Sequence, residues 1–200
     1  MKERPILFSG PMVRAILDGR KTQTRRPVKS LRHPYGHLLG PEGVAREFIA
    51  KTESIRCPLG QPCDRLWVRE TWRPDYESDT NVAKVAYHAG GCTEYFEDER
   101  DEEFWVAVIL GNQNNNWRPW RPSIHMPRWA SRITLEITRV GVERVQDITE
   151  EDAWCEGRPG FRDGCLGDSY GWFRSLWQSI YGTWDDNPWV WVVEFKRVKP

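Results

Sequence analysis

The last stretch of the chain narrows the possible folds more than any other feature. Residues 189–196 read Trp-Val-Trp-Val-Val-Glu-Phe-Lys, with apolar side chains at both odd and even positions. A strand that faces water on one side alternates apolar and polar residues, whereas this run predicts a strand buried on both faces for much of its length. Whatever the fold, other elements must cover both faces of this strand.

Further strands are predicted at residues 66–71, 82–88 and 133–138. The third of these segments alternates apolar and polar side chains, which is typical of a half-buried strand. Gly141 predicts a bulge or turn before the apolar pattern resumes at Val142.

Two short helices are predicted between the last two strands. Thr149 is the predicted N-cap of the first, with Asp152 three residues later as a weaker form of capping-box partner. The second is a helical stripe ended by Gly182, made of Phe173, Leu176, Trp177 and Ile180. Short strands mixed with short helices favour a barrel or another α+β fold over a parallel sheet.

A helix followed by a cluster of cations lies near the start of the chain. Pro11 suits the first position of this helix, and Gly19 can adopt the left-handed conformation that ends it. The next seven residues contain three arginines, one lysine and two threonines. Cations beyond a helix C-terminus are mildly stabilising, so a solvated helix end is one interpretation. The other is a site in which Lys21 acts as base and Thr24 as nucleophile.

Residues 19–26, Gly-Arg-Lys-Thr-Gln-Thr-Arg-Arg, resemble the Gly-x-Lys-Thr-x-Thr-x-Arg signature of the ASCH domain family. Residues 64–70 resemble the Gly-Asp-x-Leu-x-Val strand of that family, although Cys63 stands in the place of the glycine. Residues 145–157 resemble the helix that follows its central strands, and residues 189–196 resemble its closing strand. The resemblance covers about half of the chain and is greatest to the longer ASCH proteins of bacteriophages and prophages.

The resemblance implies an α+β fold, namely a small PUA-like β-barrel with flanking short helices and long loop insertions. We expect a single domain over residues 1–200, with insertions at about 30–61, 90–125 and 158–170. The first of these insertions has few periodic apolar residues and several Gly and Pro, which predicts a long loop arm.

The resemblance also implies a set of catalytic residues. Some small bacterial ASCH proteins are amidohydrolases that remove the acetyl group from N4-acetylcytidine, and their catalytic residues match Lys21, Thr24 and Glu156 here. In that chemistry the lysine activates the threonine hydroxyl, which requires a lowered lysine pKa, and the glutamate protonates the leaving amine. The cations available to lower that pKa and to contact the substrate are Arg20, Arg25 and Arg26. The alternative for Glu156 is a surface helix end before Gly157, with Glu150 and Glu151 as competing carboxylates.

The arginine–tryptophan segment, residues 117–132, contains four arginines and three tryptophans. Indole rings that stack on bases, beside guanidinium groups that meet phosphates, are typical of single-strand binding surfaces. The candidate nucleic-acid-binding residues are Arg118, Trp120, Arg121, His125 and Arg128. The alternative is a proline-stiffened segment whose tryptophans, Trp129 above all, pack across a barrel end.

Charge and cysteine content limit the functional classes. The 29 basic and 29 acidic residues give a formal net charge of zero, so a nucleic-acid role requires local patches. Five irregularly spaced cysteines predict no disulfide framework, and no stretch is apolar for long enough to cross a bilayer. We expect a reduced, cytoplasmic protein, which would lie in the host cytoplasm if a phage encodes it. We expect no membrane partner, and a monomer is a plausible oligomeric state.

Two histidines and two cysteines form a candidate zinc site in the sequence. His33 and His37 precede Cys57 and Cys63, and side chains of these types are zinc ligands. The five residues between the two cysteines exceed the usual gap of about two to four, so we expect no metal and no cofactor.

The leading functional hypothesis is a pocket protein that acts on or recognises a modified pyrimidine nucleoside or nucleotide. Its enzymatic form would be an amidohydrolase of N4-acylated cytidine. The alternatives are a non-catalytic module that binds RNA or a modified base, and a ribonuclease. The expected partners are therefore a nucleoside or nucleotide, or single-stranded RNA.

Overall fold

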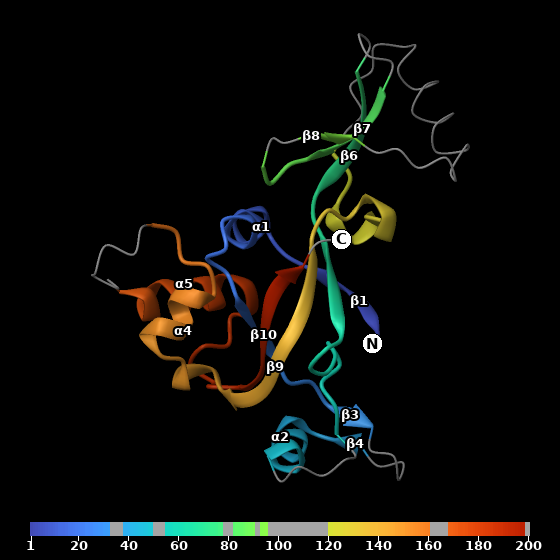
Figure 1. Ribbon diagram of the computed structural model, residues 1–200. Helices are drawn as coiled ribbons and strands as arrows, with labels where there is room; N and C mark the ends of the chain where they lie inside the picture. The colour runs from blue at the N-terminus through green and yellow to red at the C-terminus, as the bar shows by residue number, and fades with distance from the viewer. Residues whose placement is uncertain are drawn as a thin grey trace. The chain divides into compact units, whose positions relative to one another are not determined.

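Five strands form the largest sheet, in the spatial order β1-β5-β9-β10-β2 (Figure 1). The computed structural model describes residues 1–32, 38–49, 55–77, 82–90, 93–95, 120–160 and 168–198. The strands of this sheet are β1 (Glu3–Leu7), β2 (Gln23–Pro27), β5 (Arg65–Arg69), β9 (Thr134–Arg144) and β10 (Trp189–Val198). The α-helices among the described residues are α1 (Gly10–Leu17), α2 (Pro41–Ile49), α4 (Glu150–Cys155) and α5 (Ser169–Tyr181).

The chain packs as two compact units. Unit 1 consists of Met1–Arg4, Ala15–Leu66 and Ile133–Pro200, and unit 2 consists of Pro5–Arg14 and Trp67–Arg132. The fold mixes helices with sheets, and the described strands form no closed barrel. Within the described part of the chain, no helix combines the length and the apolar character that crossing a membrane needs.

Strand β10 is buried on both faces, which confirms the prediction from its sequence. Residues 190–193 are all buried. The strand pairs antiparallel with β2 and with β9, so that Val193 lies between Thr24 and Val140. Because side chains alternate along a strand, Val190 and Val192 point to the face opposite that of Trp191.

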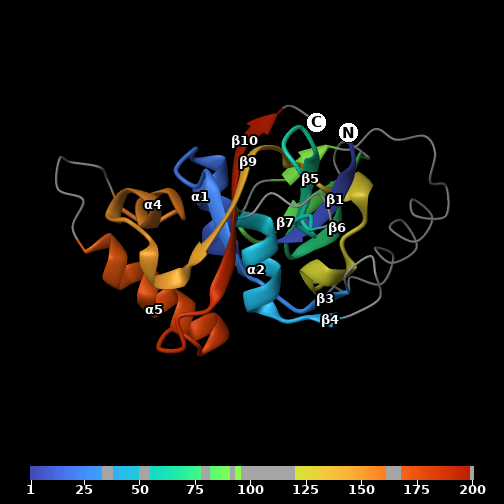
Figure 2. The same cartoon turned by 90° about the horizontal axis from the view of Figure 1, so that it is seen from below.

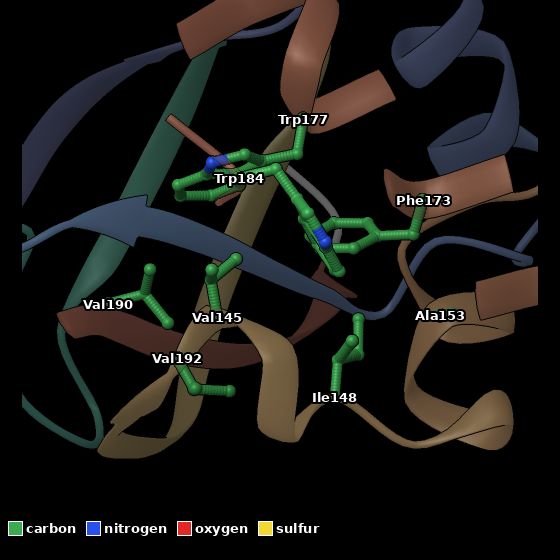
Figure 3. Close-up of a cluster of buried hydrophobic side chains, with 8 residues drawn as sticks. All are labelled: Val145, Ile148, Ala153, Phe173, Trp177, Trp184, Val190 and Val192. Carbon is green, nitrogen blue, oxygen red and sulfur yellow. The ribbon is translucent and has the colours of Figure 1, made fainter. Parts of the chain in front are cut away.

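Helices α4 and α5 cover the face of β10 that carries Val190 and Val192. Figures 1 and 2 both show these helices together on one side of the β9–β10 pair. Figure 3 shows the shared core, which consists of Val145, Ile148, Ala153, Phe173, Trp177, Trp184, Val190 and Val192. Three tightly packed aromatic rings from α5 and its following loop therefore hold the two helices against the sheet.

The predicted helix ends are confirmed in detail. The Thr149 hydroxyl accepts a hydrogen bond from the Asp152 amide at 3.1 Å, which caps α4. Gly182 ends α5 with a φ of 68°, and Gly19 follows α1 with a φ of 73°. Both glycines adopt the left-handed conformation that other residues take only at a cost.

Helix α2 corrects the prediction of a loop arm over residues 30–61. Pro41 begins the helix, where its missing N–H costs nothing, and Val44 is fully buried. The Phe48 ring meets the Trp191 ring edge-on, with 4.9 Å between centroids, so α2 covers the second face of β10. The four apolar residues of α2 recur at helical spacing over only six positions, which is too short a run to predict a helix from its period, and packing against β10 is what stabilises the helix.

Strand β9 continues through Gly141, where the sequence predicts a bulge or turn. Gly141 pairs with Val192 in regular register. The irregularity lies nearer the start of β9. Glu194 of β10 pairs with Arg139 and the next residue, Phe195, pairs with Ile137, so the register skips Thr138. An extended glycine fits a strand without strain, so its presence alone does not break the pairing.

Unit 2 contains an antiparallel sheet of β6 (Trp72–Glu77), β7 (Val82–Tyr87) and β8 (Thr93–Tyr95) in that order. The predicted strand at 82–88 is confirmed by β7 and that at 66–71 by β5 of the five-stranded sheet, whereas β6 was not predicted, because Pro74 interrupts its pattern. Its place at a sheet edge is where a strand tolerates proline. The core of this unit consists of Trp72, Val85, Tyr87, Met126 and Ala130, with Trp129 packed against it.

The turn before β5 offers a first test of stability. Cys63 is exposed and has a φ of 72°, the left-handed region that favours the glycine of the ASCH pattern. We expect Cys63→Gly to raise the free energy of unfolding by about 0.5–1 kcal/mol, measured by urea denaturation. Cys63→Ala is the control, because alanine retains the Cβ atom. Equal stability of the two variants would contradict this account of the turn.

The contacts that attach α2 to the sheet predict that the stability of the fold depends on pH. The Glu42 carboxylate accepts hydrogen bonds from Trp189 Nε1, at 2.7 Å, and from Arg144, and these two contacts lower the pKa of Glu42. A lowered carboxyl pKa stabilises the fold above the unfolded pKa, and this contribution disappears as the pH falls through the folded pKa. We therefore expect Glu42→Gln to lower the melting temperature at neutral pH, and the difference to vanish in acid below the ordinary carboxyl range. Asp186→Asn, at an exposed carboxylate, is the control and should leave the melting temperature nearly unchanged at neutral pH.

Candidate functional site

Lys21 and Glu156 lie together in the interior of unit 1. Lys21 follows the turn at the end of α1, and Glu156 is the residue that ends α4. Their charged atoms, Lys21 Nζ and Glu156 Oε2, are 2.7 Å apart, and the exposed fractions of the two side chains are 0% and 3%. The turn is held in place by backbone hydrogen bonds from Thr22 to Cys155, at 3.0 Å, and from Phe195 to Thr22, at 2.8 Å.

All three protons of the Lys21 ammonium group have acceptors. Besides the Glu156 carboxylate, Nζ donates to the backbone oxygens of Gln23 and Glu156, both at 2.8 Å. A neutral amine has only two N–H groups and would lose one of these bonds. The geometry is therefore that of a protonated lysine held by a complete set of partners.

Arg25 extends this ion pair into a network. Its guanidinium donates to Glu143 at 2.7 Å and to Glu156 at 3.3 Å, and lies 3.5 Å from Asp152. The side chain of Arg25 is 1% exposed. The two buried cations, Lys21 and Arg25, thus face three carboxylates. One of these lies on β9 and two lie on α4 and at its end, so the network ties β2 to both elements.

The surroundings shift two pKa values in this network. Burial lowers the pKa of Lys21, because leaving water penalises the charged form, while Glu156 acts in the opposite direction. Burial by itself would raise the pKa of Asp152, but hydrogen bonds from Gln23 and Thr149 hold this pKa below its ordinary value.

Thr24 points away from the network. Gln23 and Arg25, on either side of it in β2, reach Asp152 and Glu143 from one face of the sheet. Side chains alternate along a strand, so Thr24 projects from the other face, where it is buried. The structure thus brings together Lys21, Glu156 and Arg25 of the candidate catalytic set, but not Thr24.

A cavity of about 420 Å³, widely open to solvent, lies beside the network. The turn after α1 contributes Asp18, Arg20 and Thr22 to its wall, and α4 contributes Trp154 and Cys155. Lys21, between Arg20 and Thr22, is fully buried and does not line it. Hydrogen bonds fix the position of the Arg20 guanidinium, which contacts Asp18 at 2.8 Å and the backbone oxygens of Gly157 and Arg158 at 3.3 and 2.8 Å.

Gly157 allows this close arrangement of turn and helix. Its φ is 98°, in the region that favours glycine. A Cβ atom at this position would lie 2.8 Å from Ala15 Cβ and 3.0 Å from Lys21 Cβ. Any larger residue would push Lys21 and the end of α4 apart.

The other predicted site residues occupy separate positions. In unit 1, Arg26 donates to the Tyr181 hydroxyl at 3.2 Å, beside the helix α5. In unit 2 lie the described members of the arginine–tryptophan segment, namely Trp120, Arg121, His125 and Arg128. Arg118 lies outside the described residues, as do His33 and His37. Among the residues that are described, no three His, Cys, Asp or Glu side chains form a group that could hold a metal ion.

Sequence reasoning missed four residues of this site. Glu143 on β9 pairs with Arg25, Asp152 was considered only as a cap, and Asp18 and Trp154 form part of the cavity wall. The cluster of cations at residues 20–26 is a signal that carboxylates must be nearby, because buried charges require partners. The sequence contains 29 acidic residues, however, and gives no means of choosing among them.

Comparison with protein-family models, curated proteins and solved structures finds no match to this chain.

The network predicts a large loss of stability when one charge is removed. Lys21→Ala leaves Glu156 buried without its nearest cation, and we expect the free energy of unfolding to fall by about 3–5 kcal/mol. Lys29→Ala, at an exposed lysine just beyond β2, should change it by less than about 0.5 kcal/mol. Urea denaturation of the two variants would measure both values, and similar losses would contradict a structural role for the ion pair.

Proposed function

We propose that this chain is an ASCH-type pocket protein that recognises a pyrimidine nucleoside or nucleotide in the cytoplasm, and that its main sheet is part of a PUA-like barrel. The observation that carries the proposal is the cavity between the signature turn and α4. Its volume of about 420 Å³ falls within the range of small-molecule sites, roughly 300–1,000 Å³.

The cavity wall offers groups that match the edge of a pyrimidine base. Asp18 and Arg20 place a carboxylate acceptor 2.8 Å from a guanidinium donor. Cytosine presents an amino donor at N4, a ring-nitrogen acceptor at N3 and a carbonyl acceptor at O2 on one edge, and N4 acylation changes the donor side. A neighbouring donor and acceptor, already held in position, therefore suit such a base, and Trp154 and Cys155 supply a less polar wall.

The state of Lys21 favours recognition over hydrolysis. A lysine base needs a free lone pair within reach of the nucleophile. Here all three ammonium protons are bonded, and the side chain is absent from the cavity wall. Thr24, the matching nucleophile, points from the other face of β2.

An amidohydrolase is the second candidate, because one observation favours it. Burial lowers the pKa of Lys21, as a lysine base requires, and Glu156 lies 2.7 Å from its amine. In this role the lysine would have to lose one of its three acceptors before it could take a proton from Thr24. Substrate binding would need to open the network.

Binding and turnover can be measured separately. Isothermal titration calorimetry with cytidine, cytidine monophosphate and N4-acetylcytidine should detect binding, and chromatography of N4-acetylcytidine should detect no release of cytidine. Arg20→Ala should weaken binding about tenfold or more, since a hydrogen bond to a charged group contributes about 1.5–3 kcal/mol. Arg139→Ala, at an exposed arginine on β9, is the control.

Other outcomes would change the proposal. Cytidine release that is lost in a folded Thr24→Ala variant would establish the amidohydrolase instead. The absence of binding to all three compounds, with no turnover, would contradict both functions.

A further inference from the structure

The turn after α1, residues 19–22, offers no backbone N–H group to a ligand in the cavity. Each of its N–H groups donates to a backbone oxygen of the protein at 2.9–3.0 Å, namely Gly19 to Ile16, Arg20 and Lys21 to Ala15, and Thr22 to Cys155. Loops that bind phosphates do so with free backbone N–H groups that point at the anion. A phosphate in this cavity would find no such donors in the turn.

Both helices beside the cavity reach it with their C-terminal ends. Asp18 directly follows Leu17, the last residue of α1, and the α4 residues in the wall are the last two of that helix, Trp154 and Cys155. The C-terminal end of a helix carries a partial negative charge, whereas phosphates bind at N-terminal ends. The helix ends at this cavity therefore disfavour an anion.

Arg20 is the single cation among the described residues that line the cavity. Its guanidinium lies 2.8 Å from the Asp18 carboxylate and also donates to the backbone oxygens of Gly157 and Arg158. A carboxylate at this distance balances the charge of the guanidinium before any ligand binds. The described part of the wall thus contains one cation and one anion, and its formal net charge is zero.

Two further cations lie next to wall residues in the sequence, and both are occupied elsewhere. Lys21 is fully buried against Glu156. The Arg158 guanidinium donates to the Ser169 hydroxyl at 3.2 Å, and neither cation lines the cavity. Within the described part of the wall, a phosphate could obtain a cationic partner only by displacing Asp18 from Arg20.

We propose that Asp18 is a specificity-determining residue, which cancels the charge of Arg20 and thereby restricts the cavity to uncharged ligands. This inference rests on the nucleoside site proposed above and narrows its ligand to a free nucleoside or base. A nucleotide adds a phosphate with about two negative charges to the same nucleoside, and RNA carries phosphates on both sides of it. The base itself can still bond to Asp18 and Arg20, because hydrogen bonds to a balanced pair need no net charge.

Isothermal titration calorimetry with cytidine and cytidine monophosphate at low ionic strength tests this role of Asp18. In the native chain, cytidine should bind about three- to tenfold more tightly than its monophosphate, the size expected from a partly exposed charge and two helix ends. Asp18→Asn should abolish or reverse this preference, because it leaves the charge of Arg20 unbalanced. The ratio of the two affinities within one variant is the measured quantity, since contacts with the base are common to both ligands.

Matched variants separate charge from shape. Asp18→Glu keeps the carboxylate and should retain the preference for cytidine. Asp185→Asn removes the same charge from a carboxylate that is 88% exposed and does not line the cavity, and it should leave the ratio unchanged. The Asp18 side chain is 56% exposed, so circular dichroism should show that its variants are folded.

The dependence on salt provides a second measurement. In Asp18→Asn, the affinity for cytidine monophosphate should fall as salt is added, because ions screen the attraction between the phosphate and Arg20. The affinity for uncharged cytidine should hardly change over the same range.

Two results would overturn this inference alone. One is binding of cytidine monophosphate by the native chain as tight as that of cytidine, and the other is an unchanged affinity ratio in Asp18→Asn. Both leave the proposed nucleoside site standing, because both require that cytidine binds. The absence of binding to both compounds would contradict the proposed function and this inference with it.

Discussion

The buried contact between Lys21 and Glu156 is the interaction on which the rest of unit 1 depends. It joins the turn after α1 to the end of α4, and Arg25 extends it to β9. Two buried cations are stable only because three carboxylates and two backbone oxygens surround them. Once Lys21 is drawn inward, its neighbours Arg20 and Thr22 remain at the surface, where they form the wall of the cavity.

Lys21 and Thr24 could serve either catalysis or structure, and the exposure of their side chains decides between the two. A lysine base and a threonine nucleophile need a shared opening to the substrate. In this chain the lysine is closed off by its three acceptors, and the threonine occupies the opposite face of β2. Lys21 thus acts as a structural clamp, while the neighbouring side chains of Arg20 and Thr22 line the cavity.

Arginine has different surroundings in the two units. In unit 1, Arg25 is buried among carboxylates and contributes to stability and rigidity. In unit 2, the guanidinium groups of Arg69 and Arg121 lie over the indole rings of Trp67 and Trp72. The same residue type thus pairs with charges in one unit and with aromatic rings in the other.

Local chemistry by itself determined the ends of the helices and the burial of the last strand. Gly19, Thr149 and Gly182 act through their own backbone or side chain, and the apolar run in β10 requires cover wherever it lies. The helix α2, the continuous course of β9 through Gly141, and the choice of Glu143 and Asp152 as partners of Arg25 were decided only by the tertiary structure. Each of these depends on a contact between residues far apart in the chain, and local periodicity carries no information about such contacts. The separation of Lys21 from Thr24 was decided by the tertiary structure as well, because Lys21 lies in the turn after α1, which is held by contacts with α4, whereas Thr24 lies within β2.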